Sequence, residues 1–348
     1  MVCVSNTYKM LKKCKLLLAL CFLVPVGLNA QKPSDFLPDK PGKWSYSNNV
    51  TSTEAKYIAF SKTLASLAEW FHLNIPMLQN PKGYDLAATT YGQWDKYYLL
   101  NESNYGLRTE MDFSFQLFYS AGGKWTVEPP HYSFDVNNTE TGHGTNPNYT
   151  NFNELEDDPS MEQAINDAAI RMNGIFTVFP LVKELARGVN LYDCEMGGCG
   201  TLVVFNPDRP DFWIPVSVRE MAEIHRQYYK LRNKTEMDRM LLTQLEKEIS
   251  DLSDDELSAP AYSGHEEHFV LKVNGKGQGL QLMRFNPKYW DRSLPNYAIQ
   301  FMTFYYPQMG EVVLDESFKN NGHPFYSQLL VNEIDWKKLA QELIVHKP

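Results

Sequence analysis

The sequence predicts an α+β fold in which antiparallel sheets are packed by amphipathic helices. Three observations support this prediction: apolar residues at helical spacing after Thr51, alternation of apolar and polar residues from Arg108 to Tyr119, and short turns between the predicted strands. The order of one helix followed by strands occurs in residues 51–136 and again in residues 217–306. This repetition leaves open a fold made of two similar halves.

The composition is that of a globular, acidic protein. The 348 residues suffice for one large domain or two ordinary ones. Hydrophobic residues make up 43% and charged residues 22%, and 33 basic against 42 acidic side chains give a formal net charge of −9. A phosphate backbone is bound through clustered Lys and Arg, so we expect no nucleic-acid partner.

The first thirty residues predict a cleaved export signal. Four lysines between positions 9 and 15 precede a mostly apolar run over residues 16–28, which is too short to span a membrane. Lipid attachment at Cys21 is disfavoured, because Leu20 is bulkier than the residue expected before a lipid-modified cysteine. We expect cleavage near Ala30/Gln31 and a soluble mature protein that is secreted or periplasmic, without membrane insertion.

The mature chain divides into three predicted parts. Residues 31–50 contain three prolines among polar residues, which indicates an extended N-terminal arm. Residues 51–158 form a first α+β half that ends in a long Asn-rich loop over 137–158. Residues 159–348 form a second α+β half, and one continuous domain is the alternative.

Capping and periodicity predict the elements of the first half. Thr51 and Glu54 form a capping box at the start of a helix. Six apolar residues at helical spacing define its buried face: Tyr57, Phe60, Leu64, Leu67, Ala68 and Phe71. The strand from Arg108 to Tyr119 is expected to turn and return as a second strand from Trp125 to Val136.

The second half is predicted from caps and short apolar runs. Three helices are expected from their first residues: Ser160, Ser217 and Asp335. The second of these runs to about Leu252, either unbroken or with a break near Asn233. Acidic residues 251–256 are assigned to its exit loop because carboxylates are unfavourable at a helix C-terminus. A helical turn is expected over 181–187. The remaining predicted strands are short: 175–179, 201–205, 266–273, 280–285 and 298–306.

The two cysteines of the mature chain predict a disulfide. Cys194 and Cys199 flank a four-residue segment containing two glycines, and an oxidising compartment favours their pairing. A zinc site would need two further ligands at suitable spacing, and a redox pair would be expected as Cys-x-x-Cys. A loop this short removes little chain entropy, so we expect the bond to pin a turn.

Histidines supply weak metal candidates, and no cofactor is predicted. Asp135, Glu140 and the acidic run over 154–158 could also offer oxygen ligands to calcium, but the spacing of an EF-hand is absent. His265 and His268 enclose two glutamates, but on a strand they would point to opposite faces. His143 lies between two glycines in the Asn-rich loop. A polar strand start and a solvated loop are the simpler interpretations.

Aromatic residues make up 13% of the chain and suggest a binding function. Four tryptophans outside the predicted helices are candidate ligand-binding residues: Trp94, Trp125, Trp213 and Trp290. Exposed rings of this kind stack on sugars or anchor a protein partner, although large aromatics more often fill a core.

No nucleophile or phosphate-binding motif occurs in the sequence, and no catalytic residue is assigned. The leading hypothesis is therefore a secreted, non-catalytic protein that binds a glycan or an envelope or extracellular protein. The alternative is a secreted hydrolase, either metal-assisted or acting through carboxylates as acid and base.

Overall fold

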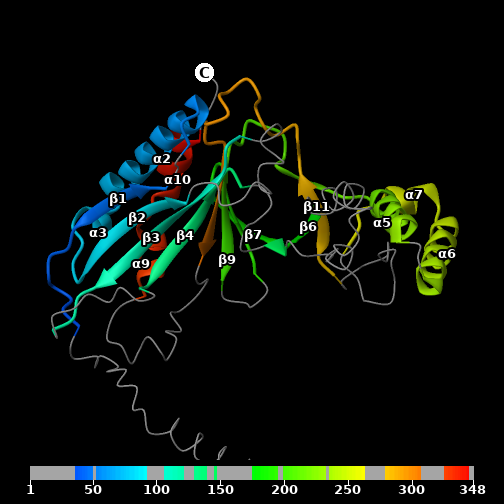
Figure 1. Ribbon diagram of the computed structural model, residues 1–348, viewed down its shortest axis with the longest axis horizontal. Coiled ribbons are helices and arrows are strands. Elements are labelled where there is room, and N and C mark those ends of the chain that lie inside the picture. Colours follow the sequence, from blue (N-terminus) through cyan, green and yellow to red (C-terminus); the bar gives the residue numbers. More distant parts are fainter. Residues whose placement is uncertain are drawn as a thin grey trace, which may run out of the picture.

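The computed structural model describes residues 36–49, 52–91, 106–120, 129–138, 145–146, 175–194, 199–232, 235–262, 279–306 and 325–344. The predicted α+β class is confirmed, because antiparallel sheets pack against helices. The described elements stack in four layers, in the order helices, sheet, sheet, helices (Figure 1).

The first helical layer and the larger sheet contain elements from both ends of the chain. The helices are α2 (Ala55–Asn74), α3 (Pro76–Gln79), α9 (Tyr326–Glu333) and α10 (Trp336–Leu343). The eight strands lie in the order β1 (Trp44–Asn48), β2 (Tyr84–Tyr91), β3 (Thr109–Leu117), β4 (His131–Val136), β12 (Phe301–Tyr306), β9 (Gly200–Phe205), β8 (Val189–Tyr192) and β7 (Leu181–Ala186). Strands β1 and β2 are parallel, and the other neighbours are antiparallel.

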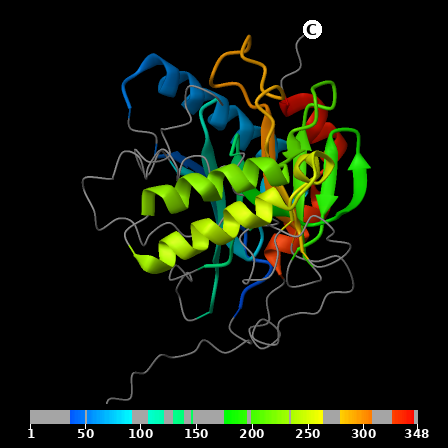
Figure 2. The same ribbon diagram turned by 90° about the vertical axis from the view of Figure 1, so that its right-hand side faces the viewer.

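The smaller sheet lies between the larger sheet and a second helical layer. Its antiparallel order is β10 (Trp213–Pro215), β11 (Gln281–Phe285), β6 (Ile175–Val178) and β5 (Thr145–Asn146). The helices are α5 (Val218–Arg232), α6 (Glu236–Ser250) and α7 (Asp254–Ser258), with α5 and α6 side by side in Figure 2.

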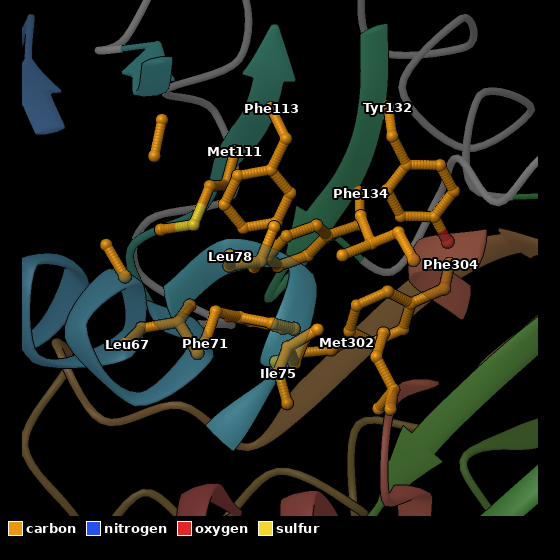
Figure 3. Packing of buried hydrophobic residues seen from close by; sticks show 14 of the residues in the cluster. Leu67, Phe71, Ile75, Leu78, Met111, Phe113, Tyr132, Phe134, Met302 and Phe304 are labelled. Carbon is orange, nitrogen blue, oxygen red and sulfur yellow. The ribbon is translucent and has the colours of Figure 1, made fainter. Parts of the chain in front are cut away.

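The main core lies between the first helical layer and the larger sheet. The six residues predicted for the buried face of α2 are those that are buried. They meet Met111, Phe113 and Phe115 of β3, whose alternation is also confirmed, and the stacked pair Phe134 and Phe304 (Figure 3). The apolar faces of α2 and β3 therefore pack the larger sheet against the first helical layer.

Two smaller cores join the remaining layers. Between the sheets, Val203 and Phe301 pack against a cluster that includes Phe176 and Phe212. Between the smaller sheet and the second helical layer, Leu282 is one of the buried residues shared with α5, α6 and α7. The smaller sheet thus has apolar side chains on both faces.

Three predicted local structures need correction. Helix α2 begins at Ala55 rather than at Thr51, because the Glu54 N–H bonds to the Ser52 hydroxyl (3.2 Å) in the turn that precedes it. Residues 181–187 are not helical. They form strand β7 and the start of a hairpin turn in which Gly188 has φ 82°, a conformation that favours glycine.

The third correction concerns the acidic residues after α6. Asp254, Asp255 and Glu256 open the short helix α7 instead of lying in a loop, whereas Asp251 is the C-cap of α6. Ser253 caps α7 by accepting a hydrogen bond from the Glu256 N–H (3.3 Å). Carboxylates are favourable at a helix N-terminus, so their position follows from the helix dipole.

The two predicted halves differ in the sheets to which their strands belong. Strands β3 and β4 of the first half are neighbours in one sheet, whereas β11 and β12 of the second lie in different sheets. Strand β12 also pairs with β4, so the larger sheet takes strands from both sides of the proposed boundary at residue 158.

Candidate functional site

The candidate site lies on the face of the larger sheet that points away from α2. Side chains alternate along a strand, so Asp112 and Asp135 emerge on the face opposite to Phe113 and Phe134. We define the intersheet polar site by the six residues on this side that carry polar groups between or beside the two sheets: Asp112, Asp135, Tyr192, Thr201, Trp213 and Thr303.

The strand register connects these residues. Asp135 is paired with Thr303 of β12, and Thr201 of β9 is paired with Tyr192 of β8. The sixth member, Trp213, comes from β10 of the smaller sheet, and its ring centroid lies 5.0 Å from that of Tyr192. These residues therefore come from six strands of the two sheets, and those of the larger sheet extend over four strand spacings, roughly 19 Å, from β3 to β8.

Three polar atoms of the site are buried and lack hydrogen bonds. They are Thr201 Oγ1, Thr303 Oγ1 and Trp213 Nε1, on side chains that are 0%, 4% and 8% exposed. Thr303 lies near the Asp135 carboxyl and slightly lowers its pKa, but the two groups are not in hydrogen-bonding geometry. Most buried polar atoms in proteins are paired, and an unpaired one costs about 1–3 kcal/mol.

Burial raises the pKa of both carboxyl groups. The pKa of Asp112 rises to about 6, with smaller and opposing effects of His131 and Glu110. The pKa of Asp135 rises to about 7, because burial and the neighbouring Glu110 outweigh Arg108 and a hydrogen bond from Asn138 (3.3 Å). Perturbed carboxyls that lie together are a common property of functional sites.

Tyr192 and Trp213 add an aromatic wall to the site. Trp213 also packs on Phe212 and Phe176, with centroids 4.8 and 5.6 Å away, so its ring is held firmly. Tyr192 is half-buried, and burial raises the pKa of its hydroxyl, which therefore stays protonated at neutral pH. Tyr192 accepts a hydrogen bond from Asn190 Nδ2 (3.3 Å).

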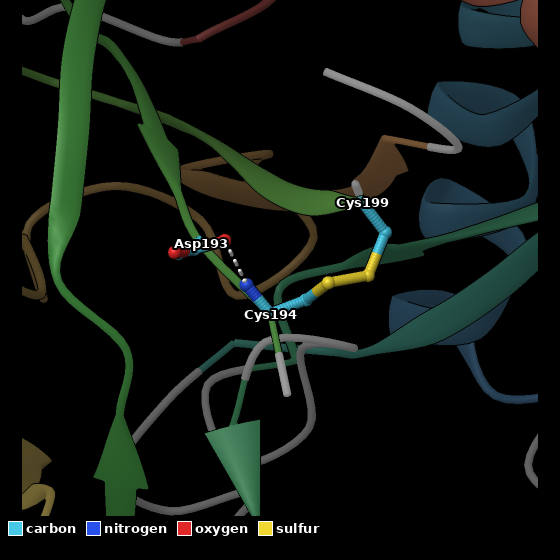
Figure 4. The surroundings of a disulfide bond; sticks show 3 residues. All are labelled: Asp193, Cys194 and Cys199. Atoms are coloured by element: carbon cyan, nitrogen blue, oxygen red, sulfur yellow. Dashed lines mark hydrogen bonds between the residues drawn. A yellow bond between two sulfur atoms is a disulfide. The ribbon is translucent and has the colours of Figure 1, made fainter. Parts of the chain in front are cut away.

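The predicted disulfide between Cys194 and Cys199 is present and borders this site (Figure 4). Their Cα atoms are 5.6 Å apart, and the Cys194 N–H donates a hydrogen bond to Asp193 Oδ1 (2.9 Å). Because β8 ends at Tyr192 and β9 begins at Gly200, the bond closes the connection between these two strands. It therefore fixes the end of the hairpin that carries two site residues.

The structure separates the predicted site residues into two groups. Trp213 and Trp290 are 8% and 5% exposed and pack in the core between the sheets, so for these two the core interpretation given beside the ligand-binding one holds. Trp213 nevertheless belongs to the site through its unpaired indole N–H. The other candidates lie outside the described residues: Trp94, Trp125, His143, His265 and His268.

Asp112 was not among the residues expected at a site, and Asp135 was considered only as a possible calcium ligand, although a signal for both existed. Each aspartate occupies a polar position of an alternating strand, opposite to the apolar face, and Asp is otherwise rare in strands. The sequence gives no comparable indication for Thr201 and Thr303, because only the folded structure shows whether a hydroxyl has a hydrogen-bond partner.

A groove beside α2 is a weaker candidate. It is lined by Tyr46, Asn48, Tyr57 and Lys62, among others. Its polar groups bond to nearby side chains, as Tyr46 does to Thr90 (3.3 Å) and Asn48 to Ser61. These polar groups already have hydrogen-bond partners within the protein, so they give no indication of a ligand.

Comparison with protein-family models, curated proteins and solved structures finds no match for the chain. In the part of the chain that the structure describes, no three His, Cys, Asp or Glu side chains are arranged to hold a metal ion. None of the described helices combines the length and apolar character needed to cross a bilayer.

Proposed function

We propose that this protein is exported and binds a glycan at the intersheet polar site. The observation that carries the proposal is the set of three buried, unpaired polar atoms on Thr201, Thr303 and Trp213. A ligand with many hydroxyl groups, each able to donate and accept, satisfies such atoms at short spacing. The adjacent rings of Tyr192 and Trp213 suit the apolar faces of a sugar.

The chemistry of the site favours a glycan over other partners. Carboxylates accept hydrogen bonds from sugar hydroxyls, and they repel phosphate, which disfavours a nucleic acid. A protein partner is usually bound over a broad surface with protruding anchors, whereas these polar atoms lie below the surface. An envelope or extracellular protein thus remains the second class of partner from the sequence.

Ligand binding should be visible as a thermal shift and as a change in tryptophan fluorescence. The probes are soluble oligosaccharides of different linkage, tested against the chain from Gln31 onward. At about one hundred times its Kd, a ligand that binds only the folded state stabilises it by about 2.7 kcal/mol.

Two variants identify the site. Trp213→Phe keeps an aromatic ring and removes the unpaired N–H, so it should weaken binding by about tenfold or more, as expected for one lost hydrogen bond. Trp290→Phe changes a similarly buried tryptophan of the same cluster and should leave affinity unchanged. Equal affinity in both variants, or no shift with any oligosaccharide, would refute the proposal.

A further inference from the structure

The two edges of the larger sheet differ in how well they are protected against further pairing. At one end, β7 has two irregularities in its register with β8, between Leu181 and Lys183 and between Glu184 and Ala186. Such irregularities and charged side chains keep an edge strand from pairing with another chain. At the other end, β1 pairs regularly with β2 and contains neither charge nor proline (Figure 1). The edge at β1 is thus the one suited to receive another strand.

The backbone of β1 presents hydrogen-bonding groups on its outer side. The Asn49 N–H donates to the Thr90 carbonyl of β2 (3.1 Å), and the Lys43 carbonyl also accepts a hydrogen bond from β2 (2.8 Å). Successive residues of a strand point their N–H and C=O groups to opposite sides, so those of Trp44 and Tyr46 point away from β2. None of the described strands pairs with β1 on this side.

The groove beside α2 adjoins this edge and offers space for side chains. It has a volume of about 330 Å³, is mostly apolar, and is formed by Tyr46 of β1 with Tyr57, Ile58, Lys62 and Ala65 of α2, among others. The last three follow one line along α2, because they are four and three residues apart. Ile58 is 46% exposed on this line. A strand added to β1 would place every second side chain on the α2 side of the sheet.

We infer that the edge of β1 and this groove bind an extended segment of another protein as an additional strand. In complexes of this kind, main-chain hydrogen bonds give affinity, and pockets for alternate side chains give specificity. The segment carries apolar side chains at alternate positions, with a carboxylate side chain between two of them. The carboxylate follows from Lys62, which is exposed between Ile58 and Ala65 and has no ion pair with any described residue.

A second copy of this chain fits the same edge less well. Two copies related by a twofold axis at β1 would present the same patch to each other, so Lys62 would occur on both sides of the contact. Like charges that face each other across paired strands are destabilising. A segment with a carboxylate at this position offers the opposite charge instead.

Peptide binding tests the inference directly. The probe is a fluorescently labelled peptide with blocked ends and the sequence Thr-Val-Thr-Glu-Thr-Val-Thr, and the protein is the chain from Gln31 onward. Fluorescence anisotropy should show saturable binding, and a peptide with Lys in place of Glu should bind about fivefold more weakly, as expected for one exposed ion pair. Lys62→Glu should reverse this preference, which a misfolded variant could not do.

Two exposed apolar residues of α2 provide a matched pair of variants. Ile58→Glu places a charge in the groove and should weaken peptide binding about tenfold or more. Leu73→Glu changes a residue that is 56% exposed on the same helix and does not line the groove, so the affinity should stay unchanged. Both residues lie on the α2 side of the larger sheet, so neither variant should alter glycan binding at the intersheet polar site.

Hydrogen exchange distinguishes the possible occupants of the edge. The amides of Trp44 and Tyr46 should exchange rapidly in the free protein and about tenfold or more slowly once the peptide is bound. Slow exchange in a free monomer would show that another part of this chain covers the edge, and slow exchange in a dimer would show a second copy. Either result overturns the inference, as does the absence of peptide binding or an unchanged affinity in Ile58→Glu.

Discussion

At the scale of single residues, the intersheet polar site departs from the rule that buried polar atoms are paired. Within the described residues, five buried side-chain atoms lack a hydrogen bond, and three of them belong to this site. A fold selected for stability alone would place apolar side chains there, as it does at the adjacent Val203 and Phe301. These unpaired atoms lower the free energy of unfolding, which is a common property of residues kept for binding.

Two buried threonines of the same sheet test this interpretation. Thr303→Val removes an unpaired hydroxyl and should raise the free energy of unfolding by about 1 kcal/mol. Thr90→Val removes a hydroxyl that bonds to Tyr46, so it should lower the free energy by a similar amount. Urea denaturation measures both values, and destabilisation by Thr303→Val contradicts the interpretation.

The raised pKa of Asp135 predicts how its removal changes the dependence of stability on pH. The folded chain keeps a proton that the unfolded chain, with an ordinary pKa near 3.9, releases at lower pH. The free energy of unfolding of the unaltered protein therefore falls as pH rises from about 4 to about 7, by about 1.4 kcal/mol for each unit of pKa shift.

Asp135→Asn should abolish this contribution. The variant and the unaltered protein should have similar stability near pH 4, and the variant should be the more stable of the two near pH 8. Denaturation curves across this pH range measure the difference. A constant difference at all pH values shows that the carboxyl titrates normally in the folded chain.

At the scale of secondary structure, the sequence was most informative where one face of an element is buried. The periods of α2 and β3 were read correctly because each contacts a single apolar layer. Strand β7 was missed because its first four residues are exposed and show no alternation. Its identity depends on pairing with β8, which a local pattern does not contain.

The candidate site was predicted only in part for the same physical reason. The cysteine pair is close in sequence, so its geometry could be anticipated. Thr201 and Thr303 are about a hundred positions apart and become neighbours only through the pairing of β9 with β12. Trp213 was chosen as a candidate exposed ring, whereas its ring is buried and its indole N–H has no hydrogen bond.

The disulfide provides a test at this scale. A double variant, Cys194→Ser with Cys199→Ser, should lower the free energy of unfolding by about 2 kcal/mol at most, since the closed loop is short. Because the bond holds the ends of β8 and β9, glycan affinity should fall at temperatures well below unfolding. Unchanged affinity would show that the hairpin holds Tyr192 and Thr201 in place without the bond.

At the scale of the whole molecule, the layers assign different tasks to different parts of the chain. The helices α2, α9 and α10 cover one face of the larger sheet, and the smaller sheet covers part of the other. The carboxyls lie on strands β3 and β4, next to the region that the smaller sheet covers. Access of a ligand to these carboxyls therefore depends on how much of this face the smaller sheet covers.

Export is the prediction that concerns the whole chain. The N-terminal pattern of lysines, apolar run and small residue predicts a mature protein that starts at Gln31. Intact-mass analysis of protein recovered from the cell envelope or the medium measures this directly. A mass that still includes residues 1–30, or a lipid on Cys21, contradicts simple cleavage.

The position of β12 has a consequence for a chain that crosses a membrane from its N-terminus. Strand β12 lies between β4 and β9 in the sheet but follows both in the sequence. Until residues 301–306 emerge, the strands already delivered can form only two separate pieces, β1 to β4 and β7 to β9. Each piece would expose an unpaired strand edge, which is a template for pairing with another chain. If the chain is exported as proposed, this strand order delays completion of the larger sheet until its last strand has been delivered.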